Sequence, residues 1–446
     1  MKRTTDLRGD LSRINKAAIA AVDPVTCLQR AVRLEGSRLV VGDRSVDLSP
    51  IERIIVVGMG KASARMAAAL EGILSERISC GLVVTADGYA APTERVTIVC
   101  AAHPIPDARG LAAAERIASL VDGAGENDLV IVLISGGGSA LLSLPAPGIE
   151  LDDLSKVNEL LLRSGARIQE MNTVRKHLSQ VKGGQLACRA FPAQVITLIL
   201  SDVPGDPLNA IASGPTVADP TTFQQVERIL RGRRLWDSVP SSVRARIEGG
   251  LRGEIDETPK PGDPALQRVN TAVIGSGALA AEAALAEGER LGYNTLLLST
   301  TLEGEAREVG RVLASLAREE VRHQRPLPLP ALIIAAGETT VAVKGDGKGG
   351  RNQELALAAA LGIEGLPGVV ICSLGTDGRD GPTDAAGGAV DGGTVGRMRE
   401  RGIDPEEYLE QNNSYKALEE ARDLIVTGPT GTNVADLCLI LVGKQE

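Results

Sequence analysis

Short apolar runs that end in glycine-rich turns and continue into Ala/Leu-rich segments recur along the chain, and they constrain its fold more than any other feature. Examples are RIIVVGMGKASARMAAAL (53–70), DLVIVLISGGGSALL (128–142) and TAVIGSGALAAEAALAEGERLGYNTLLLST (271–300). Continuous apolar strands followed by helices are typical of a parallel sheet covered on both faces. Ligands of such sheets bind at the carboxyl ends of the strands. We therefore predict an α/β fold with its functional residues in these turns.

The length of 446 residues allows two or three domains. The segment GGLRGEIDETPKPGDPALQRVN (249–270) combines charges with three prolines and lacks apolar periodicity. Such a segment is typical of an exposed linker. We place the boundary near residue 258, which predicts domains 1–258 and 259–446.

Composition excludes several classes of protein. The formal net charge is −9, and the aromatic residues are one Trp, four Tyr and two Phe, so a nucleic-acid platform is not expected. Six dispersed cysteines and three histidines offer no zinc spacing. The polar N-terminus and the absence of a long apolar run predict a cytoplasmic protein that does not bind membranes. A homo-oligomer is compatible with the sequence.

The first glycine turn, GMGK, contains Gly58, Gly60 and Lys61. A glycine turn that opens a helix presents free N–H groups, which favour anions. The spacing matches neither a Walker A motif nor a complete dinucleotide fingerprint. Only 11 of the 48 basic residues are lysines, so a lysine beside glycines suggests a point charge for phosphate. A purely structural turn is the alternative.

The second glycine turn, SGGGS (135–139), allows a ligand to approach the backbone closely. The alternatives are a tight packed turn and a nucleophile elbow, but GGGSA does not match GxSxG. Because His103, His177 and His323 are the only histidines, a Ser-His-Asp hydrolase is a poor fit. The residues that we single out are Ser135, Gly136, Gly137, Gly138 and Ser139.

Two further segments carry charges that suit phosphate or metal chemistry. NTVRKHLSQVKGG (172–184) predicts a helix with Arg175, Ser179 and Lys182 on one face, which either faces an anion or is solvated. SDVPGD follows an apolar run and supplies Asp202 and Asp206, which suit Mg²⁺ or form Asx turns.

The second half carries the densest set of polar residues. Its motifs GETT, GGRNQE, GTDGRDGPTD and GTNV each follow an apolar run or a glycine-rich loop. Phosphoryl transfer needs acidic side chains, an arginine, and glycines that let the ligand come close to the protein backbone. The spacing departs from that of an EF-hand. The polar residues concerned are Glu338, Arg351, Asn352, Asp377, Asp380, Asp384 and Asn433.

Eight motifs in this order resemble the MOFRL-type (class II) glycerate 2-kinases over essentially the whole chain. They are VVGMGKAS, SGGGSALL, NTVRKHLSQVKGG, SDVPGD with IASGPT, GETTV, GDGKGGRNQELAL, GTDGRDGPTDAAGG and GPTGTNVADL. The resemblance implies an N-terminal Rossmann-like domain, a C-terminal MOFRL α/β domain and an active site in the cleft between them. It also implies phosphorylation of D-glycerate to 2-phosphoglycerate by ATP with a divalent cation.

The resemblance implies that the family's functional residues correspond to six positions of this sequence. These are Lys61, Asp202, Glu338, Arg351, Asp377 and Asn433. Of these, we expect Lys61, Asp202, Arg351 and Asp377 to be catalytic, with Asp202 and Asp377 also as ligands of Mg²⁺ or Mn²⁺ or as groups that orient the attacking hydroxyl. Expected binding residues for D-glycerate or ATP are Gly58, Gly60, residues 135–139, Arg175, Lys182, Glu338, Asn352 and Asn433.

Two alternatives remain open at this point. The first is an NAD(P)-dependent hydroxypyruvate reductase, for which VIGSGALA (273–280) has the GxGxxA form but no catalytic His–acid pair accompanies it. The second is a sugar-phosphate-binding regulator without catalysis, which would tolerate the loss of Lys61 or Asp377.

Overall fold

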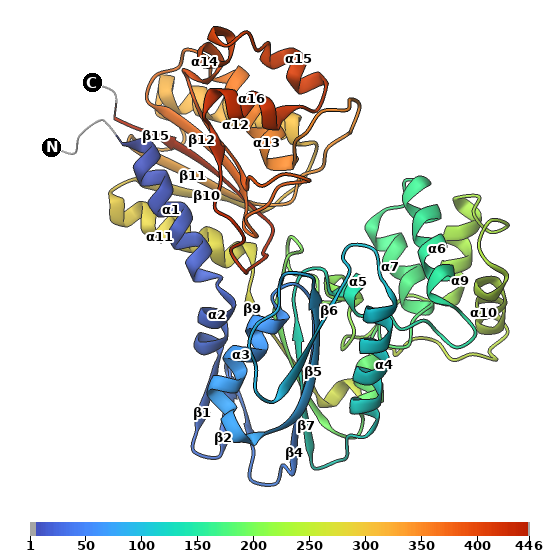
Figure 1. Cartoon of the computed structure of the whole chain (residues 1–446). Helices are drawn as coiled ribbons and strands as arrows, with labels where there is room; N and C mark the ends of the chain where they lie inside the picture. The colour runs from blue at the N-terminus through green and yellow to red at the C-terminus, as the bar shows by residue number, and fades with distance from the viewer. Residues whose placement is uncertain (1–5, 445–446) are drawn as a thin grey trace. The chain divides into compact units, whose positions relative to one another are not determined.

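The computed structural model describes residues 6–444 and divides them into two compact units, each with its own large sheet (Figure 1). The N-terminal unit comprises Cys27–Leu200 and Asp206–Ile274. The C-terminal unit comprises the described residues of Met1–Thr26, Ser201–Gly205 and Gly275–Glu446. The sequence placed one boundary near residue 258, whereas the chain contributes three separate segments to the C-terminal unit.

The N-terminal unit is built on a six-stranded sheet with the strand order β6-β5-β4-β7-β8-β9. The neighbours from β6 to β8 pair in parallel, so the predicted parallel α/β sheet is confirmed for this unit. β7 buries all seven of its residues, as expected for a strand covered on both faces. The strands are β4 (Arg53–Met59), β5 (Ile78–Ala86), β6 (Val96–Ala101), β7 (Asp128–Ile134), β8 (Gln194–Leu200) and β9 (Val269–Gly275).

Helices follow these strands where the Ala/Leu-rich segments predict them. α3 (Ser63–Leu74) packs against β4 and β5, and α4 (Ala108–Asp122) packs against β5 and β6. Asp107 caps α4 by accepting a hydrogen bond from the backbone N–H of Gly110. The shorter elements of this unit are α5 (Gly138–Leu141), α8 (Gln185–Ala190) and the 3₁₀ turns Ser75–Arg77, Ile211–Ser213 and Leu266–Arg268. α2 (Pro24–Ala31) leads into the unit.

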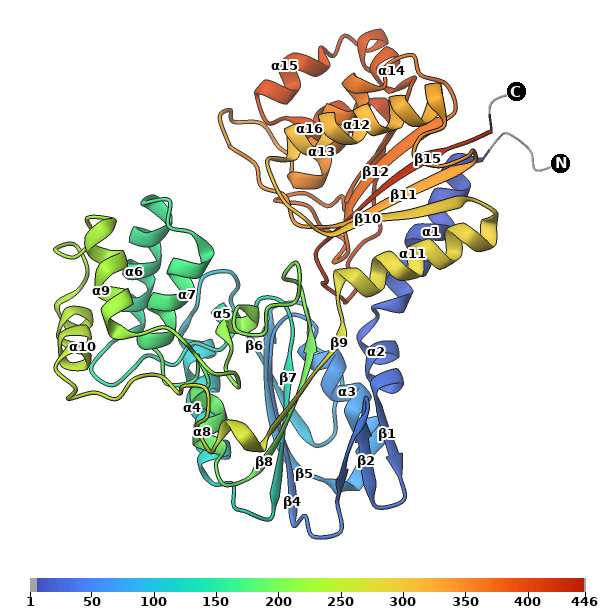
Figure 2. The same ribbon diagram turned by 180° about the vertical axis from the view of Figure 1, so that it is seen from behind.

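Two parts of the N-terminal unit lie outside the repeating pattern of strand, glycine turn and helix. A small antiparallel sheet consists of β1 (Val32–Glu35), β2 (Arg38–Val41) and β3 (Arg44–Asp47), whose four-residue strands are too short to give a clear apolar run. A separate group of helices packs around the fully buried Phe223 (Figure 2). These helices are α6 (Leu151–Arg163), α7 (Ile168–His177), α9 (Phe223–Gly232) and α10 (Ser241–Leu251).

The C-terminal unit contains a mixed sheet with helices, which confirms the predicted second α/β domain. Its strand order is β10-β11-β15-β12-β13-β14, in which β10 and β11 pair in parallel and the other four neighbouring pairs are antiparallel. The last strand of the chain, β15, lies antiparallel between β11 and β12. The strands are β10 (Asn294–Leu302), β11 (Ala331–Gly337), β12 (Val369–Gly375), β13 (Gly387–Asp391), β14 (Leu424–Ile425) and β15 (Asp436–Val442).

Helices cover both faces of this sheet (Figures 1 and 2). α11 (Gly277–Leu291) packs on β10 and β11, and α1 (Leu7–Ala21) packs along α11. The opposite face carries α12 (Ala306–His323), α13 (Arg351–Gly362), α14 (Thr394–Glu400), α15 (Pro405–Glu410) and α16 (Ser414–Ala421).

The position of α1 explains why the first residues belong with the C-terminal unit. Its residues Leu11 and Ile14 are buried. Arg8 forms ion pairs with Asp391 at 2.5 Å and with Asp423 at 2.8 Å. These contacts join residues more than 380 positions apart, and no local pattern encodes such a separation.

The segment of GxGxxA form, residues 273–280, does not belong to a βαβ unit. β9 belongs to the N-terminal sheet, whereas β10, which follows α11, belongs to the C-terminal sheet. A dinucleotide fingerprint requires both strands in one sheet, so this finding argues against the reductase alternative. Within residues 6–444 no helix has the length and hydropathy that a membrane span requires.

Candidate active site

The two glycine turns of the N-terminal unit meet at the carboxyl ends of β4 and β7, which are neighbouring parallel strands. The backbone N–H of Lys61 donates to the carbonyl of Gly136 at 2.9 Å, and the N–H of Ala62 donates to Ser135 Oγ at 2.9 Å. Gly60 has φ +120°, and a Cβ there would lie 2.3 Å from the carbonyl oxygen of Ser135. Glycine is therefore required at position 60. The same holds at Gly58, where a Cβ would lie 2.8 Å from the carbonyl oxygen of Leu133.

Residues 135–139, which we call the glycine turn, contain two backbone donors that differ from their neighbours. The N–H groups of Gly136 and Gly137 have no acceptor among the described residues. Gly137 has φ +83°. Such a turn forms a concave set of donors that suits an anion.

A chain of hydroxyl and amide groups supports the end of this turn. Ser139 Oγ lies 2.7 Å from Ser213 Oγ, which donates to Asn172 Oδ1 at 3.1 Å. Ser213 and the preceding Ala212 have positive φ values of 61° and 49°. Non-glycine residues with positive φ are uncommon and concentrate at functional sites. Sequence reasoning noted the motif IASGPT but gave Ser213 no role.

His103 also lies at the glycine turn, and its position was not predicted. A Cβ on Gly137 would lie 2.9 Å from His103 Nε2. Burial, assisted by the positive charge of Lys61, holds the pKa of His103 below its ordinary value, which favours the neutral imidazole at neutral pH. Because His103 lies in AAHP, away from the glycine motifs, only its contact with Gly137 could have identified it.

The charges of segment 172–184 do not share one helix face, so that prediction was wrong. α7 ends at His177, and Ser179 and Lys182 lie beyond it. The N–H of Gly183 donates to the carbonyl of Ser213, and Gly183 itself has φ +59°, so the chain turns instead of continuing the helix. Arg175 donates to Asn158 Oδ1 at 2.6 Å.

Lys182 lies beneath the glycine turn and is 6% exposed. Its Nζ donates to the carbonyls of Ser139 at 2.9 Å and Leu142 at 2.6 Å. Burial, with a further contribution from the charge of Arg175, lowers the pKa of Lys182 to about 7. Among the described residues no carboxylate forms an ion pair with Lys182.

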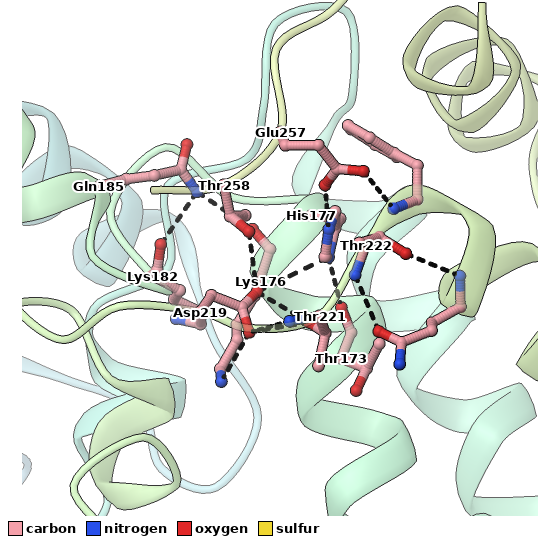
Figure 3. A network of polar contacts seen from close by, with 12 residues as sticks. Thr173, Lys176, His177, Lys182, Gln185, Asp219, Thr221, Thr222, Glu257 and Thr258 are labelled. Atoms are coloured by element: carbon pink, nitrogen blue, oxygen red, sulfur yellow. Dashed lines mark hydrogen bonds and ion pairs between the residues drawn. The ribbon is translucent and has the colours of Figure 1, made fainter. Parts of the chain in front are cut away.

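A buried polar network connects Lys182 to the helical group (Figure 3). Lys176 Nζ lies 3.3 Å from Asp219 Oδ1, and both side chains are buried. Asp219 also accepts hydrogen bonds from Thr221 and Thr258. Gln185 Nε2 donates to the carbonyls of both Lys176 and Lys182. The network therefore fixes the backbone from which Lys182 reaches the glycine turn.

In the C-terminal unit, the central feature is Arg351, the first residue of α13. Its Nε and Nη2 each lie 3.2 Å from one carboxylate oxygen of Asp436, and its Nη1 lies 2.9 Å from Glu338 Oε1. Asp436 also accepts a hydrogen bond from Asn352 Nδ2 at 2.9 Å. Because Asp436 is 5% exposed, it holds the guanidinium from inside the protein. Sequence reasoning did not single out Asp436.

The start of α13 is capped by Asp380, which accepts hydrogen bonds from the N–H groups of Asn352 and Gln353. Asn352 is 1% exposed, and its Oδ1 accepts a hydrogen bond from Ser373. Asp384, in the same motif as Asp380, accepts a hydrogen bond from the hydroxyl of Tyr415. These contacts give Asp380, Asp384 and Asn352 structural partners within the unit.

Carboxylates gather around Glu338. Burial raises the pKa of Glu338 to about 7; Arg351 opposes this rise, and the charges of Asp436, Asp202 and Asp377 add to it. Asn433 Nδ2 lies 3.5 Å from Asp202 Oδ2, and the N–H of Arg379 donates to Asp377 Oδ1 at 3.0 Å. The structure thus brings together Asp202, Glu338, Arg351, Asp377 and Asn433 in the C-terminal unit.

The donor set fits a hard divalent cation better than zinc. No group of three or more His, Cys, Asp or Glu residues that could hold a metal is found within residues 6–444. Mg²⁺, however, is commonly held by one or two carboxylates together with phosphate oxygens and water. Asp202 and Asp377 supply carboxylates of this kind, and a cation would offset the negative charge that each of them places on Glu338.

Comparison with known proteins adds family information to this geometry. A sequence profile for a domain of unknown function, DUF4147, matches residues 10–248, and the MOFRL family profile matches residues 331–436. A glycerate 2-kinase from Pyrococcus horikoshii is 45% identical over 99% of this chain and 98% of its own length.

Two further relatives bear on the alternatives. The crystal structure of a glycerate kinase from Thermotoga maritima is 43% identical, covers 98% of this chain and 99% of its own, and superposes with a TM-score of 0.86. A protein from Agrobacterium vitis that carries the name hydroxypyruvate reductase is 44% identical over 97% of this chain and 94% of its own length. Proteins with both names therefore share this sequence pattern.

The buried pair Lys176–Asp219 yields a stability prediction. Asp219→Ala should lower the free energy of unfolding by about 3 kcal/mol, because it leaves the buried Lys176 unpaired. Burial acts to raise the pKa of Asp219, but Lys176, Thr221 and Thr258 together hold that pKa below its ordinary value. Its stabilisation should therefore be present above the ordinary aspartate pKa and disappear as the pH falls through the lowered value.

Urea unfolding at pH 7 and at pH 3 measures both effects. Glu159→Ala is the control, because the pair Lys156–Glu159 is exposed at both ends and should contribute less than about 1 kcal/mol. Equal, small losses for the two variants at pH 7 would contradict the role of Asp219.

Proposed function

Because the chain belongs to the MOFRL-type glycerate kinase family, we propose that it transfers the γ-phosphoryl group of ATP to the 2-hydroxyl of D-glycerate. The observation that carries this proposal is the Arg351 site, where one guanidinium is fixed by Asp436 and Glu338 beside Asp202 and Asp377. Phosphoryl transfer requires positioning and charge neutralisation, and it demands little covalent chemistry of the protein.

The proposed role of each residue follows from its charge. Lys61 stabilises the phosphoryl oxygens during transfer, and Arg351 binds an anionic oxygen of a substrate while Asp436 keeps the guanidinium in place. Asp202 and Asp377 would hold Mg²⁺ or Mn²⁺, which supplies neutralisation of phosphate charge when bound. Asp202 or Asp377 alternatively orients the hydroxyl, and Asn433 positions Asp202 by its side-chain amide.

A coupled assay tests the activity directly. Formation of ADP should require D-glycerate, ATP and a divalent cation together. The same preparation should not oxidise NADH or NADPH when hydroxypyruvate is added. This control tests the reductase activity for which the relative from Agrobacterium vitis is named. Stoichiometric oxidation of NADH or NADPH without ADP formation would overturn the proposal in favour of the reductase.

One prediction for catalysis concerns Lys61. Lys61→Ala should lower kcat by about 100-fold or more, because it removes a charge that stabilises the transition state. The fold should persist, since Lys61 lies in a turn and is not part of the buried core. Circular dichroism and the coupled assay together check this result, and an unchanged kcat would refute the assignment.

Another prediction for catalysis concerns Asp377. Asp377→Asn keeps the side-chain volume but removes one negative charge. If Asp377 is a metal ligand, the Mg²⁺ concentration for half-maximal rate should rise, and Mn²⁺ should partly restore the rate. If Asp377 orients the hydroxyl, kcat should fall while the Mg²⁺ dependence stays the same. Rate titrations against free Mg²⁺ distinguish the two roles, and superimposable curves would exclude both.

A further inference from the structure

One loop of the C-terminal unit joins the two residues of an ion pair at the Arg351 site. Glu338 directly follows β11, Arg351 begins α13, and Arg351 Nη1 lies 2.9 Å from Glu338 Oε1. The connecting residues 341–350 contain no helix or strand. Because an irregular loop loses conformational entropy when it is fixed, the contacts that hold this loop help to determine where Arg351 lies.

Asn412 holds the loop through its side-chain amide. It lies in the turn between α15 and α16 and is 6% exposed. Its Oδ1 accepts hydrogen bonds from the backbone N–H groups of Lys344 at 2.7 Å and Gly345 at 3.1 Å. Its Nδ2 donates to Glu354 Oε2 at 2.8 Å. One amide therefore contacts the chain both before and after Arg351.

The neighbours of Asn412 add further contacts with the loop. The N–H of Gly347 donates to the carbonyl of Gln411 at 3.0 Å, and the N–H of Lys348 donates to Asn413 Oδ1 at 3.2 Å. A Cβ on Gly345 would lie 2.5 Å from the carbonyl oxygen of Gln411. Glycine at this position thus lets the loop pack closely on the turn between α15 and α16.

Glu354, the carboxylate to which Asn412 donates, is itself held inside the unit. Arg307 of α12 donates from Nε to Glu354 Oε1 at 2.9 Å and from Nη2 to the carbonyl of Leu409 at 3.0 Å. Arg307 and Glu354 are 5% and 2% exposed. Both carboxylate oxygens of Glu354 therefore have partners, and a fully satisfied buried network of this kind is rigid.

The backbone conformation at Asn412 does not require asparagine. Its φ is +53°, in the left-handed region that glycine adopts most readily and asparagine tolerates. Glycine would provide none of the hydrogen bonds to Lys344, Gly345 and Glu354. The residue type is therefore explained by these contacts, and non-glycine residues with positive φ concentrate at functional sites.

We propose that Asn412 is a positioning residue for Arg351 in phosphoryl transfer. By holding the loop before Arg351 and the helical turn after it, Asn412 keeps the guanidinium in the orientation that the reaction uses. The inference rests on the proposed kinase function and adds to it a residue that acts through Arg351. A displacement of about 1 Å in a positioned group is enough to lower a rate by about 100-fold.

Asn412→Gly tests the proposal without straining the backbone, because glycine accepts the positive φ. It should lower kcat/KM for D-glycerate and ATP by about 10-fold or more, since Arg351 is then less well placed. Gln324→Gly is the matched control. Gln324 also carries an amide and has φ +52°, but it is exposed at the end of α12, so kcat/KM should stay within about twofold.

Gly345→Ala tests the same contact from the loop. Its Cβ would press against the carbonyl of Gln411, while Asn412 and the buried pair Arg307–Glu354 remain in place. This variant therefore stays informative even if Asn412→Gly fails to fold, and it should also lower kcat/KM. Gly396→Ala is its control, because a Cβ on Gly396 has no atom within 4 Å.

A double-mutant cycle separates positioning from a general loss of stability. Arg351→Lys keeps the charge but removes the planar set of donors that needs to be oriented. In this background Asn412→Gly should lower kcat/KM by less than about twofold. Calorimetric titration with D-glycerate, and separately with Mg²⁺ and a non-hydrolysable ATP analogue, provides a readout without turnover. Asn412→Gly should weaken only a ligand that Arg351→Lys also weakens.

The outcomes separate the inference from the proposed function. If the wild type is active and both Asn412→Gly and Gly345→Ala keep kcat/KM within about twofold, the inference is wrong, even if urea unfolding shows a loss of stability. An equal loss of kcat/KM in the wild-type and Arg351→Lys backgrounds would also overturn it. If the wild type forms no ADP from ATP and D-glycerate, the proposed function itself fails.

Discussion

The carboxylate of Asp436 accepts hydrogen bonds from Nε and Nη2, along one edge of the Arg351 guanidinium, from inside the C-terminal unit, and the arrangement of that site depends on this contact. Asp436 is the first residue of β15, the strand that lies between β11 and β12. Arg351 begins α13, whose first turn Asp380 caps. A strand and a helix are thereby joined at one ion pair, which leaves Nη1 of Arg351 directed at Glu338.

The sequence predicts what is encoded locally and misses what depends on distant contacts. The glycine turns at Lys61 and Ser135 follow buried strands as expected, because apolar runs and glycines signal their own structure. The antiparallel insertion of β15 and the docking of α1 were not predictable, since both pair segments far apart in the sequence. The same reason applies to individual residues: Lys182 leaves the helix that its spacing suggests, and His103 and Asp436 reach their sites through tertiary contacts alone. The predicted cleft between the domains stays a prediction.

The measurement that tests the central claim most directly is the ³¹P NMR spectrum of the product formed from D-glycerate, ATP and Mg²⁺. Phosphate on the 2-oxygen couples to one proton, so the account predicts a doublet from 2-phosphoglycerate that grows as ADP accumulates. A triplet from a phosphate on the 3-oxygen, which couples to two protons, would contradict the proposed position of transfer. A spectrum that contains only ADP and inorganic phosphate would contradict the kinase itself.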